Sequence, residues 1–437
     1  MTDERALIDF VTSQRWFGSK TREVTHASVV DSAVLRDSDP RLEVQLVETR
    51  FDTGTHETYQ LVTNGGFDAL GDPRQVRELV HLMRSGAKLP AADGVVEFDA
   101  VHGDVQAGEL REARVVTAEQ SNTSIVFDDE LILKVFRRLE AGINPELELL
   151  RFLTERGFAN IAQLAGWYSY AGKQMTATLG ILQRFVVGGE DGWARALDAV
   201  ASGDDAFVDS LRGLGEVTGR MHSILGSDPS DPNFCPEATS TESLGLLTAT
   251  VDEEIENIFK DLPEDVPELE PIRGRGEEVR ERLRLLTNLG GAGRVIRHHG
   301  DFHLGQTLWS QDDWVILDFE GEPARSLPER RRKRSPLRDV AGMLRSFAYA
   351  ASAAELLRGA DVPPGWETRA RDEFLAGYRA TVEQSLVPSG AAMDKLLKVF
   401  ELEKAVYELR YELNNRPDWV GIPVAGIVRM LEEEVPV

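Results

Sequence analysis

Residues 299–306 read HGDFHLGQ, and residues 315–323 read VILDFEGEP. The first stretch has Asp301 after a His-Gly turn and Gln306 five positions later, and the second has Asp318 directly after an apolar run. Apolar runs bounded by turn residues are typical of strands. We therefore expect a strand that ends at the His-Gly turn and then a hairpin whose second strand ends at Asp318. This arrangement would bring the three polar side chains together.

This order of side chains suits the transfer of a phosphoryl group from a nucleotide. One carboxylate can orient and deprotonate an attacking hydroxyl, while an amide and a second carboxylate hold Mg²⁺ against the phosphates. We predict Asp301 as the catalytic base and Gln306 and Asp318 as metal ligands, with ATP and Mg²⁺ as cofactors. Glu320 is either a third metal ligand or a simple polar residue. A lone Gly-Asp pair more often only caps a turn, but the ordered set favours catalysis.

The motifs HGD-x4-Q and LDFE resemble those of the aminoglycoside-phosphotransferase-like kinases, which share the two-lobed protein-kinase fold. Further stretches extend the likeness along nearly the whole chain, among them QRWFGSK (14–20), residues 118–149 and AVYELRYELNNRPDWVGIP (405–423). Together they are similar to the maltokinase-like family of actinobacterial sugar kinases, which includes glucosamine kinases. The resemblance implies an α+β, bilobal protein-kinase-like fold with an N-terminal α/β cap subdomain and a mainly helical C-lobe.

The pattern of apolar residues predicts three parts along the chain. Residues 1–90 form the cap subdomain, with a helix, a set of strands and a second helix. Residues 91–187 complete the N-lobe with further strands and with a helix that begins at Asn144 and Pro145, a typical cap and first-turn pair. Residues 188–437 form the helical C-lobe, in which only short strands flank the two motifs; its main predicted helices are 205–225, 243–286, 339–359 and 392–414.

Lys134 lies in the middle of an apolar strand pattern, where an unpaired ammonium would be costly. We predict that it contacts the nucleotide phosphates and pairs with Glu148, with Glu146 as the competing partner because the two acids lie on different faces of a helix. A lysine that reaches the surface is the alternative. No glycine-rich loop precedes Lys134, and the predicted phosphate-binding hairpin consists of Gln120, Ser121, Asn122, Thr123 and Ser124.

The segment from Gln183 to Val186, which includes Phe185, is predicted to connect the lobes and to contact adenine through its backbone. An ordinary buried strand end is the alternative for this segment.

Residues 405–419 form a predicted helix with polar and aromatic side chains on one face. Such a face suits a sugar, because aromatic rings pack against a pyranose and carboxylates accept hydrogen bonds from its hydroxyls. A solvated helix face is the alternative. His303 either contacts the acceptor as well or only hydrogen-bonds its own loop. The other predicted substrate-binding residues are Tyr407, Glu408, Tyr411, Glu412, Asn415, Arg416 and Trp419.

Glucosamine, phosphorylated to glucosamine 6-phosphate, is the favoured substrate, and maltose, phosphorylated to maltose 1-phosphate, is the alternative. Phe302, Thr307 and Trp309 differ from the residues of maltokinases at these positions and predict a smaller acceptor pocket. Acids near the end of the chain can hold a protonated amine through charge-assisted hydrogen bonds, namely Glu408, Glu412 and Asp418. An aminoglycoside phosphotransferase and an inactive kinase-fold scaffold are less favoured, the scaffold because all the expected catalytic residues are present.

The chain carries 74 acidic and 49 basic residues, a formal charge of −25, which repels nucleic acid and anionic lipid. The basic run at 328–335 is therefore expected to pair with acids or to face solvent, in a segment that corresponds to a kinase activation loop. A single cysteine, an acidic N-terminus and the lack of a long apolar run predict a cytoplasmic protein without membrane contact. We also expect a monomer, in which Asp339 fixes the catalytic loop through backbone hydrogen bonds.

Overall fold

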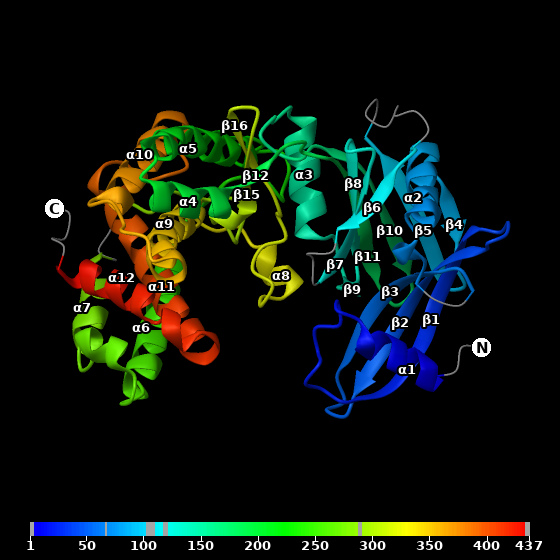
Figure 1. Cartoon of the computed structure of the whole chain (residues 1–437), viewed down its shortest axis with the longest axis horizontal. Helices are drawn as coiled ribbons and strands as arrows, with labels where there is room; N and C mark the ends of the chain where they lie inside the picture. The colour runs from blue at the N-terminus through cyan, green and yellow to red at the C-terminus, as the bar shows by residue number, and fades with distance from the viewer. Residues whose placement is uncertain (1–3, 66–67, 102–109, 117–120, 287–290, 433–437) are drawn as a thin grey trace. The chain divides into compact units, whose positions relative to one another are not determined.

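The computed structural model describes residues 4–65, 68–101, 110–116, 121–286 and 291–432 (Figure 1). The chain divides into two compact units. The N-unit comprises residues 1–155 and 161–188, and the C-unit comprises residues 156–160 and 189–437. Among the described residues, no helix combines the length and the apolar composition that a membrane span requires.

The first sheet of the N-unit is an antiparallel meander covered by a helix. Within the described residues its strand order is β1-β2-β3-β9. Apolar residues alternate along these strands, and one face packs against the helix α1 around Trp16, Phe17 and Tyr59. Helix α1 confirms the helix that the sequence predicted near the N-terminus. The elements are α1 (Glu4–Ser13), β1 (Val24–Arg36), β2 (Leu42–Phe51), β3 (His56–Thr63) and β9 (Arg138–Leu139).

The second sheet of the N-unit is larger, and all its strand pairs are antiparallel. Its order over the described residues is β4-β5-β10-β11-β8-β7-β6. The strand β10 (Leu164–Gly172) was not predicted, because glycines weaken its strand pattern; a Cβ at Gly166 would lie 2.8 Å from the Asp99 carbonyl oxygen of β5. The other strands are β4 (Lys88–Pro90), β5 (Gly94–Ala100), β6 (Ala113–Val116), β7 (Asn122–Phe127), β8 (Leu131–Phe136) and β11 (Thr176–Arg184).

A buried glutamine joins the two sheets of the N-unit. Gln60 lies on β3 of the first sheet, and its amide group donates hydrogen bonds to the carbonyl oxygens of Phe136 and Leu179 at 2.8 and 2.6 Å. Tyr168 on β10 donates its hydroxyl to the Gln60 amide oxygen at 2.9 Å. Replacing Gln60 by an apolar residue would leave buried polar groups without this partner, and such a loss lowers the stability of the fold.

Three helical segments lie beside these sheets, η1 (Ala69–Gly71), α2 (Pro73–Ser85) and α3 (Pro145–Glu155). Asp72 caps α2 by accepting a hydrogen bond from the Arg74 amide. The predicted start of α3 is confirmed, because Asn144 Oδ1 accepts a hydrogen bond from the Glu146 amide at 2.8 Å and Pro145 occupies the first turn.

The C-unit is mainly helical, as predicted, but its helices differ in number from the expected set. The predicted helix 243–286 is broken around η2 (Pro267–Ile272), because proline cannot continue a helix. Helices α4, α10 and α12 were not predicted. Polar residues dominate α10, and the other two helices are short. The helices are α4 (Gly192–Ser202), α5 (Asp205–Leu225), α6 (Thr241–Lys260), α7 (Gly276–Leu286), α8 (Leu327–Arg330), α9 (Leu337–Arg358), α10 (Trp366–Thr381), α11 (Ala391–Asn415) and α12 (Gly421–Glu432), with short η3 (Leu304–Gln306) and η4 (Pro417–Trp419).

Short strands position the two sequence motifs in the C-unit. The predicted hairpin is present as β15 (Thr307–Ser310) and β16 (Asp313–Ile316), with Gln311 and Asp312 at positive φ in its turn. The strand β12 (Glu190–Asp191) extends this sheet, and β13 (Glu237–Ala238) pairs with β14 (Arg294–Val295). The prediction of a strand reaching the His-Gly turn was wrong: in the described part of the chain, strand pairing after β14 continues only as a bridge between Ile296 and Arg334.

Helices α5 and α10 approach each other through glycines. A Cβ built on Gly377 of α10 would lie 1.9 Å from the carbonyl oxygen of Arg212 of α5. In contrast, a Cβ built on Gly213 of α5 would meet only the Trp314 side chain, at 3.8 Å. Because backbone cannot move aside cheaply in a packed interior, contact of this kind requires glycine at position 377.

We expect Gly377→Ala to lower the free energy of unfolding by about 2–3 kcal/mol, because the added methyl group overpacks the helix pair. Gly213→Ala is the matched control, and it should stabilise the protein slightly because alanine favours a helix by about 1 kcal/mol. Urea unfolding of the two variants measures both effects. An equal effect of the two substitutions would contradict this account of the close approach.

Candidate active site

The loop that carries the HGD motif is fixed by a carboxylate from α9. Asp339 accepts hydrogen bonds from the backbone amides of His299 at 2.8 Å and Gly300 at 2.9 Å. Gly300 has φ +87°, and a Cβ there would lie 3.4 Å from the Cα of Gly321, so glycine suits the turn. The expected role of Asp339 in fixing this loop is confirmed.

Asp339 is itself held by buried residues of α5 and α10. His222 Nε2 lies 3.0 Å from Asp339 Oδ2, and His222 Nδ1 lies 3.1 Å from the Tyr378 hydroxyl. Burial favours the neutral form of Asp339, but the neighbouring His298 and His222 outweigh this effect and hold the pKa of the carboxyl well below its usual range. Asp339 is therefore a carboxylate at neutral pH, as its role as acceptor requires.

His299 connects the two sequence motifs. Its Nε2 lies 2.8 Å from the carbonyl oxygen of Leu317, so Nε2 carries the proton and donates it. Its Nδ1 accepts a hydrogen bond from the Asp301 amide at 3.4 Å, and its ring packs against Phe302 and Phe319. The imidazole thus fixes the backbone at the predicted base and at Leu317.

Two of the predicted metal ligands, Gln306 and Asp318, meet across the hairpin. Gln306 Nε2 lies 3.2 Å from Asp318 Oδ2, and the Leu317 amide donates to the Gln306 carbonyl oxygen at 2.9 Å. Asp318 has φ +58°, a conformation that is uncommon outside glycine and typical of functional sites. A carboxylate and a carboxamide oxygen are the hard donors that Mg²⁺ prefers, so this donor set fits the predicted ion.

Asp301 shares its surroundings with His303. Burial lowers the pKa of His303, and the negative charges of Asp301 and Asp318 oppose this shift. His303 also caps η3, because its Nδ1 accepts a hydrogen bond from the Gly305 amide at 3.1 Å. The imidazole therefore hydrogen-bonds its own loop, one of the two roles that the sequence left open, and lies beside the predicted base.

Two charged residues that the sequence analysis missed complete this cluster. Lys404 Nζ on α11 lies 4.0 Å from Asp301 Oδ1 and 3.4 Å from Glu322 Oε1. Glu322 also pairs with Arg325. Two signals pointed to them: Glu322 belongs to the quoted motif VILDFEGEP, and Lys404 precedes Tyr407 by one helical turn.

In the N-unit, Lys134 forms the ion pair that its buried position requires. Its Nζ lies 2.8 Å from Glu146 Oε2, and its side chain is 12% exposed. Glu146 was the competing choice of partner in the sequence, and Glu148, the first choice, is also buried on α3. Lys134 is therefore held in place on β8 rather than extended to the surface, which was the alternative.

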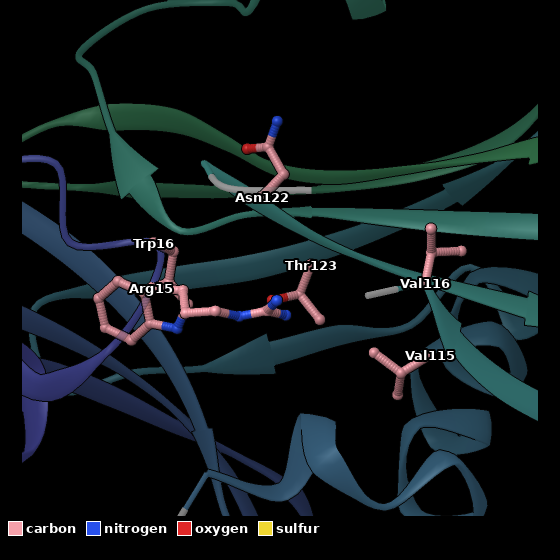
Figure 2. A pocket seen from close by; sticks show the side chains of 6 residues that line it. All are labelled: Arg15, Trp16, Val115, Val116, Asn122 and Thr123. Atoms are coloured by element: carbon pink, nitrogen blue, oxygen red, sulfur yellow. The ribbon is translucent and has the colours of Figure 1, made fainter. Parts of the chain in front are cut away.

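The described part of the predicted phosphate-binding hairpin borders a small pocket. Asn122 and Thr123 line it together with Arg15, Trp16, Val115 and Val116, and Figure 2 shows the Arg15 side chain extending toward Thr123. Arg137 donates a hydrogen bond to the Thr123 hydroxyl at 2.8 Å.

The other residues of that hairpin differ in their exposure to solvent. Ser121 is exposed and Ser124 is fully buried. Gln120 lies outside the described residues.

The segment predicted to contact adenine lies at the end of β11. Gln183 is buried and donates its amide to the Ala162 carbonyl oxygen at 3.3 Å. The Phe185 amide donates to the Glu130 carbonyl oxygen at 2.8 Å, and the Arg114 guanidinium lies over the Phe185 ring. Phe185 and Val186 are half-buried. Their contact with adenine stays a prediction.

The residues of the predicted sugar-binding face of α11 fall into two stripes along the helix. Tyr407 is half-buried, and burial together with the charges of Glu322 and Asp301 raises the pKa of its hydroxyl. Tyr411 is 44% exposed, and Asn415 donates a hydrogen bond to the Tyr411 carbonyl oxygen. Among these three residues, Tyr407 therefore lies in the surroundings of Asp301.

The second stripe faces inward and has partners in the C-unit. Glu408 Oε2 accepts hydrogen bonds from Arg345 at 2.9 and 2.7 Å. Glu412 is 1% exposed, and it accepts hydrogen bonds from Arg416 at 2.9 and 2.6 Å and from the Tyr349 hydroxyl at 3.1 Å. Both acids stabilise the helix packing, whatever else they bind.

Aromatic residues cover the end of this stripe. Trp419 stacks on Tyr349 with ring centroids 6.4 Å apart, and the Arg416 guanidinium lies over the Trp419 ring.

The three residues expected to reshape the acceptor pocket, Phe302, Thr307 and Trp309, are buried or half-buried, and their effect on that pocket stays a prediction. Phe302 is 3% exposed and Thr307 is fully buried, with its hydroxyl donating to the Leu304 carbonyl oxygen. Trp309 packs edge-on against Trp314 under the Arg195 guanidinium. Thr307 and Trp309 lie on β15, and Phe302 lies in the HGD loop against the ring of His299.

The basic run at 328–335 pairs partly with acids, as expected. Arg330 donates a hydrogen bond to the Glu320 carbonyl oxygen at 3.0 Å, and Lys333 pairs with Glu237 at 2.5 Å. The run thus helps to fix the segment that follows Asp318.

We expect His298 to make the C-unit less stable in acid. Burial lowers the pKa of His298 to about 4, whereas an exposed histidine has a pKa of about 6.5. Between these values the unfolded chain binds a proton that the folded chain does not, so stability falls as the pH decreases from about 6.5 to 4, by at most about 1.4 kcal/mol per pH unit. Urea unfolding at pH 7 and pH 5 measures this slope.

His298→Asn should make this slope shallower, and His81→Asn, at an exposed position of α2, is the control. An unchanged slope in His298→Asn would show that another group causes the acid sensitivity.

Comparison with known proteins agrees with this architecture. The model of the phosphotransferase enzyme family (APH) matches residues 112–374, and the maltokinase N-terminal cap domain matches residues 10–118. A glucosamine kinase of Streptacidiphilus jiangxiensis is 26% identical over 84% of this chain and 82% of its own length. One of Mycolicibacterium smegmatis is 26% identical over 74% and 80%.

Solved structures show the same fold. A glucosamine kinase (crystal form B) has a TM-score of 0.76 at 22% identity and covers 97% of this chain and 99% of its own. A glucosamine kinase in complex with glucosamine, ADP and inorganic phosphate has a TM-score of 0.75 at 21% identity and covers 99% and 100%. The predicted α+β kinase-like fold is confirmed. Because the family model covers well over half of the chain, this protein belongs to the phosphotransferase enzyme family.

Proposed function

We propose that this phosphotransferase is a glucosamine kinase that transfers the γ-phosphate of ATP to the 6-hydroxyl of glucosamine, with Mg²⁺ as cofactor. The observation that carries the proposal is the meeting of Gln306 and Asp318 in the same unit as Asp301 and His303. The likeness to proteins named glucosamine kinases, which extends over the cap and the helical C-unit, supports the choice of sugar.

The residues of the C-unit account for the reaction. Asp301 accepts the proton of the 6-hydroxyl as the sugar oxygen attacks the γ-phosphorus atom, and the bond from this phosphorus to the β,γ-bridging oxygen breaks to release ADP. Gln306 and Asp318 would hold Mg²⁺, which neutralises charge on the phosphates. The hydrogen bonds that the backbone amides of the loop donate to His299 and Asp339 keep Asp301 in place throughout.

The N-unit supplies the nucleotide side of the proposal. The Lys134 ammonium, fixed by Glu146, is suited to contact the phosphates as the corresponding ion pair does in kinases. Ser121, Asn122 and Thr123 of the hairpin, which are exposed or half-buried, provide polar groups for the same purpose. A cytoplasmic location and a monomeric state belong to the proposal as predictions.

The first test is a substrate panel. Coupled ADP release should be fastest with glucosamine, when compared with glucose, N-acetylglucosamine, maltose and aminoglycosides. Asp301→Asn should lower kcat for glucosamine by about 1,000-fold, because the substitution removes the catalytic base and keeps the size of the side chain. Asp312→Asn, in the exposed hairpin turn, removes the same charge and should leave kcat unchanged. Turnover of maltose without turnover of glucosamine would contradict the proposal.

The second test concerns the ammonium of the sugar. Both hydrogen bonds from Arg345 reach Oε2 of Glu408, and within the described residues its Oε1 receives none, whereas both oxygens of Glu412 are engaged. We therefore expect Glu408→Gln to raise KM for glucosamine about 10-fold, the effect of one charge-assisted hydrogen bond, with little change for glucose.

Glu412→Gln serves as the comparison and should change the two KM values equally. If Glu408→Gln also affects both sugars equally, Glu408 does not recognise the amine.

A further inference from the structure

Lys404 lies between two acids of the active-site loops. It is on α11, its side chain is 29% exposed, and its Nζ is 4.0 Å from Asp301 Oδ1 and 3.4 Å from Glu322 Oε1. Its ammonium also lies over the ring of Tyr407, 5.3 Å from the centroid. No role for Lys404 follows from the motif reading, because the lysine is about a hundred residues away from Asp301 in the sequence.

We propose that Lys404 is a positioning residue for the sugar kinase reaction, which holds the Asp301 carboxylate by Oδ1 and so directs Oδ2 toward the acceptor hydroxyl. This inference rests on the proposed function. A distance of 4.0 Å is longer than a hydrogen bond, so the attraction between the two groups is mainly that of their opposite charges. This attraction acts within a protein whose formal charge is −25.

Lys404 is itself fixed, which a positioning residue requires. Glu322 accepts a hydrogen bond from its Nζ, and Arg325 pairs with the same carboxylate. Burial lowers the pKa of Lys404, but the charges of Glu322, Asp301 and Glu408 outweigh burial and raise it overall. The side chain is therefore a cation at neutral pH and links α11 to the loops of both sequence motifs.

The side chain of Asp301 has less support from its own loop. Asp339 and His299 accept hydrogen bonds from backbone amides of the loop, including that of Asp301, and these bonds fix the path of the chain. A misplacement of about 1 Å in a reacting group can lower a rate about 100-fold. An electrostatic contact with Lys404 supplies the orientation of the carboxylate that the backbone contacts leave undefined.

The test compares Lys404→Met, Lys404→Arg and Glu322→Gln with the wild-type protein. We expect Lys404→Met to lower kcat for glucosamine about 100-fold while KM for ATP changes less than about 3-fold. Lys404→Arg should recover most of the loss, because it keeps the charge. Glu322→Gln should lower kcat about 10-fold, since it removes the anchor and leaves the cation. Lys395→Met, on the same helix, is the matched control and should have wild-type kcat.

Crystal structures of the wild-type and Lys404→Met proteins give a readout that does not require turnover. The Asp301 carboxylate should lie within about 4 Å of Nζ in the wild type and should rotate in the variant. An unmoved carboxylate in Lys404→Met, or a kcat close to that of the wild type, overturns the proposal. If the wild-type protein phosphorylates no sugar of the panel, the glucosamine kinase proposal fails, and the crystal structures still decide whether Lys404 orients Asp301.

Discussion

The carboxylate of Asp339 is the constraint on which the arrangement of the C-unit depends. It accepts hydrogen bonds from two backbone amides of the HGD loop. It also contacts His222, which in turn contacts Tyr378. Three helices, α5, α9 and α10, therefore determine the path of one short loop. A buried carboxylate with several hydrogen bonds is costly to disturb, so the loop is fixed before any substrate arrives. A base on this loop has its backbone preorganised, which is what efficient proton transfer requires.

The fold was predictable where the signal is local. The caps of α3, the hairpin at 307–316 and the long helices α5, α9 and α11 follow from turn residues, capping residues and apolar periodicity. The prediction failed for elements whose conformation depends on contacts with residues remote in the sequence. The strand β10 contains glycines that weaken its pattern, yet the close approach of β5 requires one of them. The strand before the HGD motif is short because its backbone bonds with Asp339 instead of a neighbouring strand.

The candidate site divides in the same way. The proximity of Gln306 to Asp318 and the backbone contacts of Asp339 were predictable from the sequence, because the order of these residues along the chain reflects the hairpin and the helix that hold them. The pairing of Lys134 was narrowed to two acids, and the structure contains the pair with Glu146. The stripes of α11 could not be assigned, because a helix pattern does not show that Arg345 and Tyr349 meet Glu408 and Glu412. Lys404 was missed for the same reason, since its neighbours are remote in sequence.

The contacts of Gln60 bear on how such a protein can be shortened or recombined. Its amide satisfies the carbonyl groups of Phe136 and Leu179 inside the second sheet, although Gln60 belongs to the first. Cutting away the N-terminal sheet would remove this donor and uncover the part of the second sheet that Gln60 contacts. A shortened chain, or a chimaera with a foreign N-terminus, would therefore need a replacement for this one side chain, and the first sheet is better regarded as an internal part of the N-unit than as a removable module.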